Sequence, residues 1–330
     1  MKTLFQVIAL WLGLGLTAKA CDLCAIYSAN NARPDAASGW LVTVSDQFIP
    51  YGTVQLNDRE LPPSFLNQAF VDSSVTHLVP TWNFAEGVGV SLNVPLAYRR
   101  FKRFQLTPSG IQTESGTEAG LGDLSIIGRY TLFRRAEMDY SVAINLMAGV
   151  KLPTGDAGRL REEVQTTRLL DQIYGVGHQH ATSGVHLRDL ALGSGSVDGV
   201  FGVTLTSRLD RWFLNAQFQY YLRTAGESDY RVGDEAMVAG GPGAYLILKD
   251  HFTLSLQANA TYDRMSPDVL LGRNNRNTGM SAWYLGPDLA MTWGAHLNAN
   301  LGVDVPLSIA NDGLQNVPDV RIHTGLTWRF

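Results

Sequence analysis

The sequence is poor in cysteine, in charge and in long apolar runs. Its 330 residues include 2 Cys, and 17% are charged, against about a quarter in an average chain. The formal net charge of -4 argues against a basic protein that binds nucleic acid. After the first segment, no run approaches the ~20 apolar residues that a membrane helix needs. Aromatic residues make up 10% of the chain, which excludes the composition of a disordered protein.

The N-terminal segment has the pattern of a secretory signal peptide. Lys2 precedes an apolar core over 4–16, and the small residues Ala18 and Ala20 fit cleavage before Cys21. An uncleaved anchor helix is disfavoured because this core is short. We therefore expect a signal peptide over 1–20 and an exported mature chain that begins with a short periplasmic segment over 21–38.

From Gly39 onward the chain alternates apolar and polar residues with a period of two. Between Phe252 and Asp263, for example, Leu254 and Leu256 alternate with Ser255 and Gln257. Such runs predict strands of about 10–14 residues, whereas globular strands usually have ~5–6. Their second face is too polar for the core of a soluble sandwich. Strands of ~10 residues with one apolar and one polar face are typical of outer-membrane barrels. The predicted fold is all-β, a transmembrane antiparallel up-and-down β-barrel over 39–330.

About twelve strands are expected, joined by alternating long and short connections, as in barrels with short periplasmic turns and long outer loops. An even strand number would place both termini in the periplasm. The expected strands lie near 39–50, 69–84, 87–104, 120–134, 138–155, 195–209, 211–224, 235–249, 251–264, 279–293, 295–309 and 317–330.

The aromatic residues separate by strand end, as expected for rings at the two membrane interfaces. Ten lie beside the short turns or the termini: Trp40, Trp82, Phe84, Phe133, Tyr140, Trp212, Phe252, Trp293, Trp328 and Phe330. Five lie near the long loops: Tyr98, Phe101, Tyr220, Tyr262 and Trp283. The chain also ends in Phe330 on an alternating strand, a pattern that resembles the C-terminal signal read by the outer-membrane assembly machinery.

Proline recurs at the expected outer ends of three strands, at Pro95, Pro153 and Pro306. Proline removes a donor from the strand ladder and is normally confined to edges, ends and bulges. The repetition indicates either simple strand termination or a bent rim with a lateral gap.

Nine charged residues are expected to face the lumen: Arg99, Asp123, Arg129, Lys151, Arg223, Asp263, Asp304, Arg321 and Arg329. Both signs occur, so strong ion selectivity is not expected. The same residues are equally suited to ion pairs that fill a narrow interior, and a barrel of about twelve strands has a modest one. Arg159–Tyr174, with Leu169, Leu170 and Ile173, reads as an amphipathic helix in the longest loop and as the candidate constriction.

The only two cysteines form the motif Cys21-Asp-Leu-Cys24. In the oxidising periplasm such a pair most simply forms a disulfide. Binding of a metal or a redox partner, and lipidation of Cys21, stay open as alternatives. His178 and His180 offer a weak metal site in the longest loop, and solvated histidines are the simpler interpretation. No cofactor is expected.

Several Gly-rich segments are similar to a known family. They are Gly120–Leu124 with Gly128–Tyr130, Gly149–Gly155, Leu192–Asp198 and Asp229–Asp234. Over roughly 85–330 the chain resembles the outer-membrane proteins attached to meta-pathway phenol degradation, usually described as transporters. The resemblance implies a β-barrel channel with a role in the uptake of aromatic or apolar small molecules, and it does not extend to Cys21 and Cys24.

The leading functional hypothesis is therefore a passive channel for small solutes in the outer membrane of a Gram-negative bacterium. A membrane-bound hydrolase would need a Ser or Asp paired with His at an accessible rim, and the seven His show no such pairing with Ser, so no enzyme is expected. The alternative is a scaffold that docks a periplasmic partner through Cys21 and Cys24. The expected partners are the lipid bilayer, the assembly machinery and a small solute, while the oligomeric state stays open.

Overall fold

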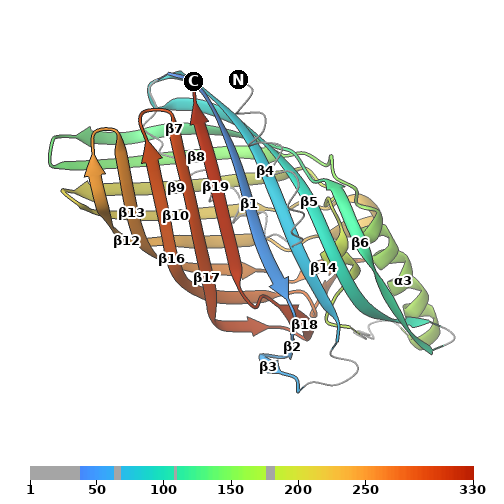
Figure 1. Ribbon diagram of the computed structural model, residues 1–330. Coiled ribbons are helices and arrows are strands. Elements are labelled where there is room, and N and C mark those ends of the chain that lie inside the picture. The colour runs from blue at the N-terminus through green and yellow to red at the C-terminus, as the bar shows by residue number, and fades with distance from the viewer. Residues whose placement is uncertain (1–37, 63–67, 108–109, 176–182) are drawn as a thin grey trace, which may run out of the picture.

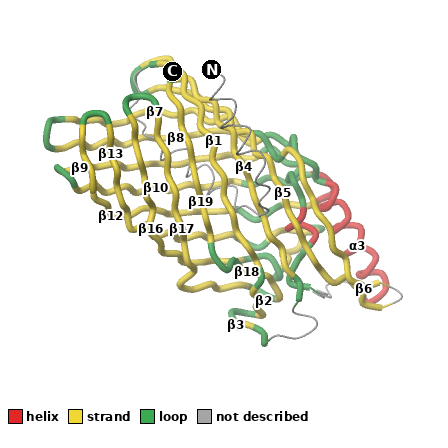
Figure 2. Tube along the Cα trace, in the orientation of Figure 1, coloured by secondary structure: helices red, strands yellow, loops and turns green. Residues whose placement is uncertain are grey.

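The computed structural model describes residues 38–62, 68–107, 110–175 and 183–330. Twelve antiparallel strands close a barrel in which hydrogen-bonded neighbours follow the order of the chain (Figures 1 and 2). The barrel strands are β1 (Gly39–Tyr51), β4 (Phe70–Ala85), β5 (Val88–Thr107), β7 (Ser125–Ala136), β8 (Tyr140–Lys151), β9 (Asp198–Leu209), β10 (Trp212–Leu222), β12 (Glu235–Lys249), β13 (Phe252–Met265), β16 (Met280–Trp293), β17 (Leu297–Asn311) and β19 (Arg321–Arg329). The expected fold is confirmed.

Closure of the barrel joins the first strand to the last. β1 pairs with β19 from Leu41 opposite Arg329 to Phe48 opposite Ile322. On its other edge β1 pairs with β4 along its whole length. A closed barrel leaves no edge strand within its wall, so every strand contributes its backbone groups to two ladders.

The side-chain alternation is the reverse of that in a soluble β protein. On β13 the inward residues Ser255, Gln257 and Asn259 are buried, whereas Leu256 between them is exposed on the outer surface. The other barrel strands also have apolar side chains outside, and their inward side chains are mostly polar, apart from a buried apolar cluster on β7, β8, β9, β10 and β12. This arrangement fits a barrel surrounded by hydrocarbon and filled by its own polar groups.

The two ends of the barrel differ, and we name them by their connections. At the turn end, neighbouring strands are joined by tight turns with a left-handed residue, such as Gly87, Asp210 and Gly294. The loop end carries helix α3 (Gly158–Tyr174), the short 3-10 helices η2 (Leu187–Leu190) and η3 (Glu227–Asp229), and two small sheets. One sheet contains β2 (Thr53–Leu56), β3 (Arg59–Glu60) and β18 (Leu314–Val317), and the other contains β11 (Tyr230–Arg231), β14 (Asp268–Leu270) and β15 (Arg273–Asn275).

One additional strand, β6 (Gly110–Leu121), lies where the sequence predicted a loop. Its partner β5 is 20 residues long and pairs with β7 near the turn end and with β6 near the loop end. β6 and β7 are thus two parts of one strand, interrupted at 122–124. At the interruption the Gly122 N–H donates to the Pro95 carbonyl at 2.8 Å. Among the described strands none pairs with the second edge of β6, which extends beyond the barrel beside α3 (Figure 1).

The aromatic ring at the turn end is formed largely as predicted. Trp40, Trp212 and Trp293 are exposed on the outer surface, and the rings of Trp40 and Trp82 stack 5.8 Å apart. At the loop end Tyr98 and Trp283 are exposed, but the placement of Phe101 in the outer ring was wrong. Phe101 occupies an inward position of β5 and packs against the loops that cover the lumen.

The proline positions mark three different features. β5 continues through Pro95 and β17 through Pro306, which directly precedes a register shift, whereas β8 ends at Lys151 before Pro153. Strand termination therefore explains the position of Pro153 but not those of Pro95 and Pro306.

In the described part of the chain, no helix is long and apolar enough to cross a membrane.

Candidate functional site at the loop end of the lumen

The loop between β8 and β9 sends a segment into the barrel opening. We call residues 183–196 the mouth segment. Its Val185 and Leu190 are buried in an apolar cluster with Val71 of β4 and Phe101 of β5. Leu187, in η2, is buried as well. This packing covers part of the lumen with a piece of the chain that follows β5 by 76–108 residues in sequence.

Helix α3 precedes the mouth segment and confirms the helix predicted over 159–174. The face of α3 that packs against the protein is not the expected one with Leu169 and Ile173. Leu160 and Val164 are buried against Tyr230 and Leu270 of the neighbouring loops, whereas Leu169 and Ile173 are exposed. The helix thus braces the outer loops, and the mouth segment takes the position inside the opening that the sequence assigned to the helix.

Hydrogen bonds hold the mouth segment to the barrel wall. The guanidinium of Arg99 on β5 donates to the Ala191 carbonyl. The Asp123 carboxylate accepts the Ser194 N–H at 2.8 Å and the Gly155 N–H at 2.9 Å. Near the other end of the segment, the imidazole Nε2 of His186 lies 2.9 Å from the Leu314 carbonyl. These bonds fix one end of the segment to the barrel wall and the other end to β18 of a small loop-end sheet.

Five residues of alternating charge follow one another around the wall, and we call them the charge row. They lie at the loop ends of consecutive strands: Asp123, Lys151, Asp198, Arg223 and Glu235. The Lys151 ammonium is 2.6 Å from Asp123 and 2.8 Å from Asp198. The Arg223 guanidinium is 3.3 Å from Asp198 and 3.2 Å from Glu235. All five are buried, and such burial of charge is tolerated because each has an opposite partner.

Further round the wall, Arg321 of β19 forms a second buried pair with Asp263 of β13, at 2.7 Å. Its guanidinium also lies 3.7 Å from the ring centre of Tyr284 on β16. Deeper in the lumen, His323 lies 3.8 Å from the Asp304 carboxylate. Inward-facing charges thus occur on both sides of the opening, in nearly equal numbers of each sign.

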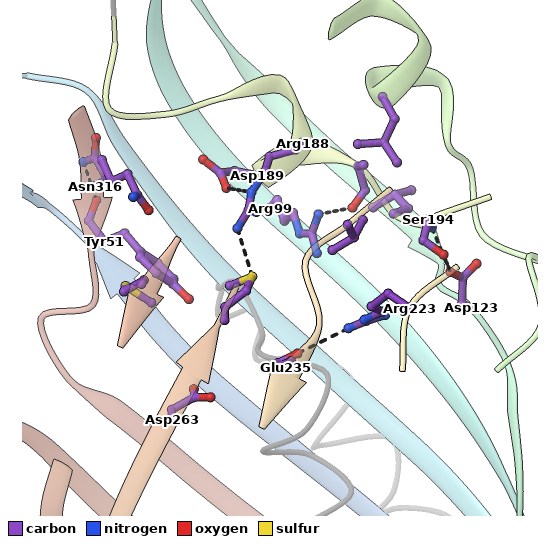
Figure 3. Close-up of a pocket in the computed structure, with 18 of the residues that line it drawn as sticks. Tyr51, Arg99, Asp123, Arg188, Asp189, Ser194, Arg223, Glu235, Asp263 and Asn316 are labelled. Atoms are coloured by element: carbon purple, nitrogen blue, oxygen red, sulfur yellow. Dashed lines mark hydrogen bonds and ion pairs between the residues drawn. The ribbon is translucent and has the colours of Figure 1, made fainter. Parts of the chain in front are cut away.

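A cavity of about 170 Å³ lies between the charge row, Arg321 and the mouth segment. Figure 3 shows Arg99, Arg188 and Arg223 directed into this space from different elements, with Asp123 and Glu235 beside them. Met265 and Met280 add apolar surface to its wall. The cavity therefore offers hydrogen-bond donors, acceptors and polarisable sulfur to one small molecule.

The lumen below the cavity has one apolar side. Six inward residues of β7–β12 form a buried cluster, which we call the apolar arc: Ile127, Met147, Val200, Tyr221, Met237 and Ala239. The remaining strands present polar groups, including Gln47 of β1, His77 of β4 and Asn259 of β13. All of these side chains are buried and fill this part of the barrel. A path between them would have apolar side chains on one side and hydrogen-bonding groups on the other.

The nine residues predicted to face the lumen lie in three places. Arg99, Asp123, Arg223, Asp263 and Arg321 line the cavity, and Lys151 and Asp304 lie close to it. Arg129 is nearer the turn end, where it donates to Asn83 Oδ1 at 3.0 Å. Arg329 lies at the turn end of β19. Cys21, Cys24, His178 and His180 lie outside the described residues, as does the predicted signal peptide.

Arg188 of η2 also lines the cavity, and its ion-pair partner Asp268 lies on β14, outside the barrel wall. Both of its carboxylate contacts to Asp268 measure 2.8 Å. Burial opposes its charge, but Asp268 and Asp189 raise the pKa of Arg188 well above its ordinary value. Burial, together with Asp268, also raises the pKa of the neighbouring Tyr230. Arg188 is therefore charged, and the Tyr230 hydroxyl keeps its proton and donates it to Asp268.

Sequence reasoning missed the apolar arc and the role of Asp198. Met147 and Val200 occur in runs where both faces contain apolar residues, so alternation alone did not reveal that inward apolar residues of neighbouring strands form one cluster. Asp198 stands at the start of β9, and its place within a Gly- and Ser-rich motif was the available signal. Within the described residues, no group of three or more His, Cys, Asp or Glu side chains is arranged to hold a metal ion.

Comparison with solved structures supports the fold. An outer membrane channel from Pseudomonas putida F1 is similar over 89% of this chain and 96% of its own, with a TM-score of 0.59 and 11% identity. A Pseudomonas aeruginosa FadL homologue (TM-score 0.40, 8% identity, 96% and 99% covered) and the CymD monoaromatic hydrocarbon channel (0.37, 7%, 96% and 95%) are more distant. No protein-family model and no curated protein matches the sequence. The chain thus shares the fold of an outer-membrane barrel.

Proposed function

We propose that the protein is a passive outer-membrane channel for small amphiphilic solutes, aromatic compounds included. The apolar arc opposite a polar wall is the observation that supports this proposal. A porin for hydrophilic solutes has a polar, water-filled interior. Here the ring or alkyl group of a passing solute would contact Met147 and Met237, while its hydroxyl or carbonyl group would bond to Gln47 or Asn259.

The cavity under the mouth segment fits the size of such solutes. A cavity of about 150 Å³ in another protein accommodates benzene, and the cavity here measures about 170 Å³. Its charges nearly balance, so neither anions nor cations are strongly favoured. A small neutral molecule with one or two polar groups is the best match to this wall.

The proposal includes an orientation in the membrane. Barrels of this class have short periplasmic turns and longer outer loops, which places the turn end in the periplasm and the loop end outside the cell. The N-terminus then enters from the periplasm, after removal of the predicted signal peptide. Phe330 is exposed beside Trp40, whose carbonyl accepts its N–H, and we propose that the assembly machinery binds this end.

Planar bilayers and proteoliposomes test the channel. The purified protein is expected to give discrete conductance steps and to speed the entry of a monoaromatic alcohol over that of a sugar of similar size. A heat-denatured sample supplies the control for leakage. Absence of conductance steps together with uptake no faster than in protein-free vesicles would refute the channel.

A further inference from the structure

The outer surface of β5 and β6 carries a cationic patch at the loop end. Arg100 and Lys102 project outward from β5, directly opposite Thr117 and Ser115 of β6. Residues opposite each other on antiparallel strands share one face, with Cβ atoms about 5 Å apart. We call these four residues, together with Asp72 of β4, the headgroup patch.

The headgroup patch begins where the apolar surface of the same strand ends. Leu92, Leu96 and Tyr98 of β5 are exposed on the outer surface, and Arg100 is the next outward residue after Tyr98. Two residues of a strand span about 7 Å. The cations therefore lie at the depth where hydrocarbon gives way to lipid headgroups.

The contacts within the patch leave a net charge of +1. Arg100 is 57% exposed and pairs with Asp72, which is 17% exposed. The ring of Phe70 lies 5.4 Å from the Arg100 guanidinium. The Lys102 ammonium donates to the neutral Gln68 Oε1 at 3.1 Å and lies 5.8 Å from the ring centre of Phe104. The two cations with one carboxylate give +1, and Ser115 and Thr117 add two exposed hydroxyls.

The two neighbouring cations of the headgroup patch differ from the single outward cation Arg264. Arg264 of β13 is an exposed outward cation at the loop end of another strand, and its strand neighbours are the uncharged Ala236 and Ser281. Charges on the lipid-facing side of a barrel are unfavourable at depth and tolerated near the interfaces. Two adjacent cations with hydroxyls beside them thus form a distinct site, whereas Arg264 is an isolated charge.

We propose that the headgroup patch binds the phosphorylated headgroup of a lipid A-type glycolipid in the outer leaflet. Arg and Lys side chains pair with phosphate oxygens, and hydroxyl groups donate to the same oxygens. The acyl chains of the lipid then lie against the apolar surface of β5. This site rests on the proposed orientation, in which the loop end faces outward, and it does not depend on conduction.

A second copy of the chain is a poorer occupant. A symmetric dimer in a membrane has its axis along the membrane normal, so the patch would meet its own copy at the same depth. Two surfaces of charge +1 would then face each other, which is unfavourable. An anionic lipid supplies the opposite charge without this repulsion.

Native mass spectrometry of the mature protein in detergent, titrated with bis-phosphorylated lipid A, tests the site. We expect a bound lipid whose affinity falls about 30-fold in the double variant Arg100→Gln with Lys102→Gln, since each cation contributes about fivefold at a membrane surface. Arg264→Gln is the matched control and should stay within about twofold. Asp72→Asn raises the patch charge to +2 and should tighten binding.

Each result decides the proposal. If the double variant binds lipid A as tightly as the wild type, or if dephosphorylated lipid A binds equally well, the lipid binding is nonspecific and the proposed site is overturned. If inorganic phosphate alone binds with the same dependence on Arg100 and Lys102, the patch is a site for free phosphate and the proposal is overturned. A wild-type dimer that is lost in the double variant would assign the patch to a second copy of the chain and would also overturn the proposal. Bilayer conductance of the same preparations shows that the variants fold, and its absence in the wild type would count against the channel and not against this site.

Discussion

The ammonium group of Lys151, at the loop end of β8, lies 2.6 Å from the carboxylate of Asp123 in the break between β6 and β7. Both side chains are buried. The same carboxylate accepts the N–H of Ser194, so a single ion pair joins the strand break, the end of β8 and the mouth segment. The Lys151 ammonium also pairs with the Asp198 carboxylate at the start of β9, so the same cluster includes this strand.

Lys151→Met is expected to lower the free energy of unfolding by about 3–5 kcal/mol, because removal of one partner of a buried pair leaves uncompensated charge. Here two carboxylates, Asp123 and Asp198, would lose their shared cation. Urea unfolding in lipid vesicles, followed by tryptophan fluorescence, measures the loss.

The matched control is Arg134→Ala at the turn end. Arg134 pairs with Glu86 at 2.8 Å, but both side chains are exposed. Exposed pairs contribute about 0–1 kcal/mol. If Lys151→Met costs no more than Arg134→Ala, the charge row does not hold the loop end together.

The sequence resemblance gains a physical explanation from the charge row. The motif at 120–124 contains Asp123, the motif at 149–155 contains Lys151, and the motif at 192–198 contains Ser194 and Asp198. All of them meet at one buried cluster. Their glycines permit the close approach of backbones: a Cβ on Gly155 or Gly193 would lie under 3.0 Å from the backbone of the other.

The barrel wall was predictable because lipid and lumen impose a strict period of two, visible in β13 and β16. The break at Gly122 was not, because β6 keeps its polar pattern beyond the barrel, where no hydrocarbon surrounds it. The packed face of α3 was also misjudged. Leu169 and Ile173 form the stronger apolar stripe, but the partners of Leu160 and Val164 come from two other loops. Tyr230 is 66–70 residues away and Leu270 is 106–110 residues away, so the sequence pattern of the helix does not contain them.

The outer loops are expected to respond to pH through Glu163 of α3. Burial raises the pKa of Glu163 above its ordinary value, against the opposing effects of His186, Arg103 and the Leu187 N–H. A raised pKa means that the folded loop favours the protonated acid. The stabilisation is complete below the ordinary pKa and is lost as the pH rises through the raised pKa.

Glu163→Gln removes this dependence because the amide stays neutral. Limited proteolysis of the 156–197 loop, measured from about pH 4 to about pH 8, is expected to accelerate with pH in the wild type and to change less in the variant. Identical pH profiles for the two proteins would contradict the assignment. Glu162→Gln, on the same helix and paired with Arg159, controls for loss of a charge alone.

Gly286→Ala is expected to disrupt the pairing of β16 with β17. A Cβ at Gly286 would collide with the carbonyl oxygen of Val303, which is backbone and cannot rotate away. Overpacking of this kind costs about 1–3 kcal/mol. Gly128→Ala is the control, since its Cβ would lie 3.6 Å from the Ala148 carbonyl oxygen, an ordinary van der Waals contact. The heat-modified mobility shift on gels reports the folded fraction, and equal fractions for both variants would contradict the clash.

Loss of the apolar anchor of the mouth segment is expected to raise conductance. Val185, Leu187 and Leu190 are buried, and each contributes about 1.5–3 kcal/mol to docking. Replacing all three with Ser should release the segment and produce larger and more variable single-channel steps. Leu169→Ser with Ile173→Ser changes the exposed face of α3 and should leave the steps unaltered. Unchanged steps in the triple variant would place the constriction elsewhere.

The apolar arc is expected to determine which solutes pass. Met147→Gln with Met237→Gln keeps the length of both side chains but adds hydrogen-bonding groups to the apolar side of the lumen. Burial of apolar surface contributes about 25 cal/mol per Å², so a ring that loses about 40 Å² of apolar contact should bind about fivefold more weakly along the path. In proteoliposomes, the ratio of monoaromatic alcohol uptake to sugar uptake should fall accordingly. Met138→Gln, in an exposed turn, should preserve the ratio. A ratio that is equal in all three proteins would mean that the arc only fills the barrel and does not select its solute.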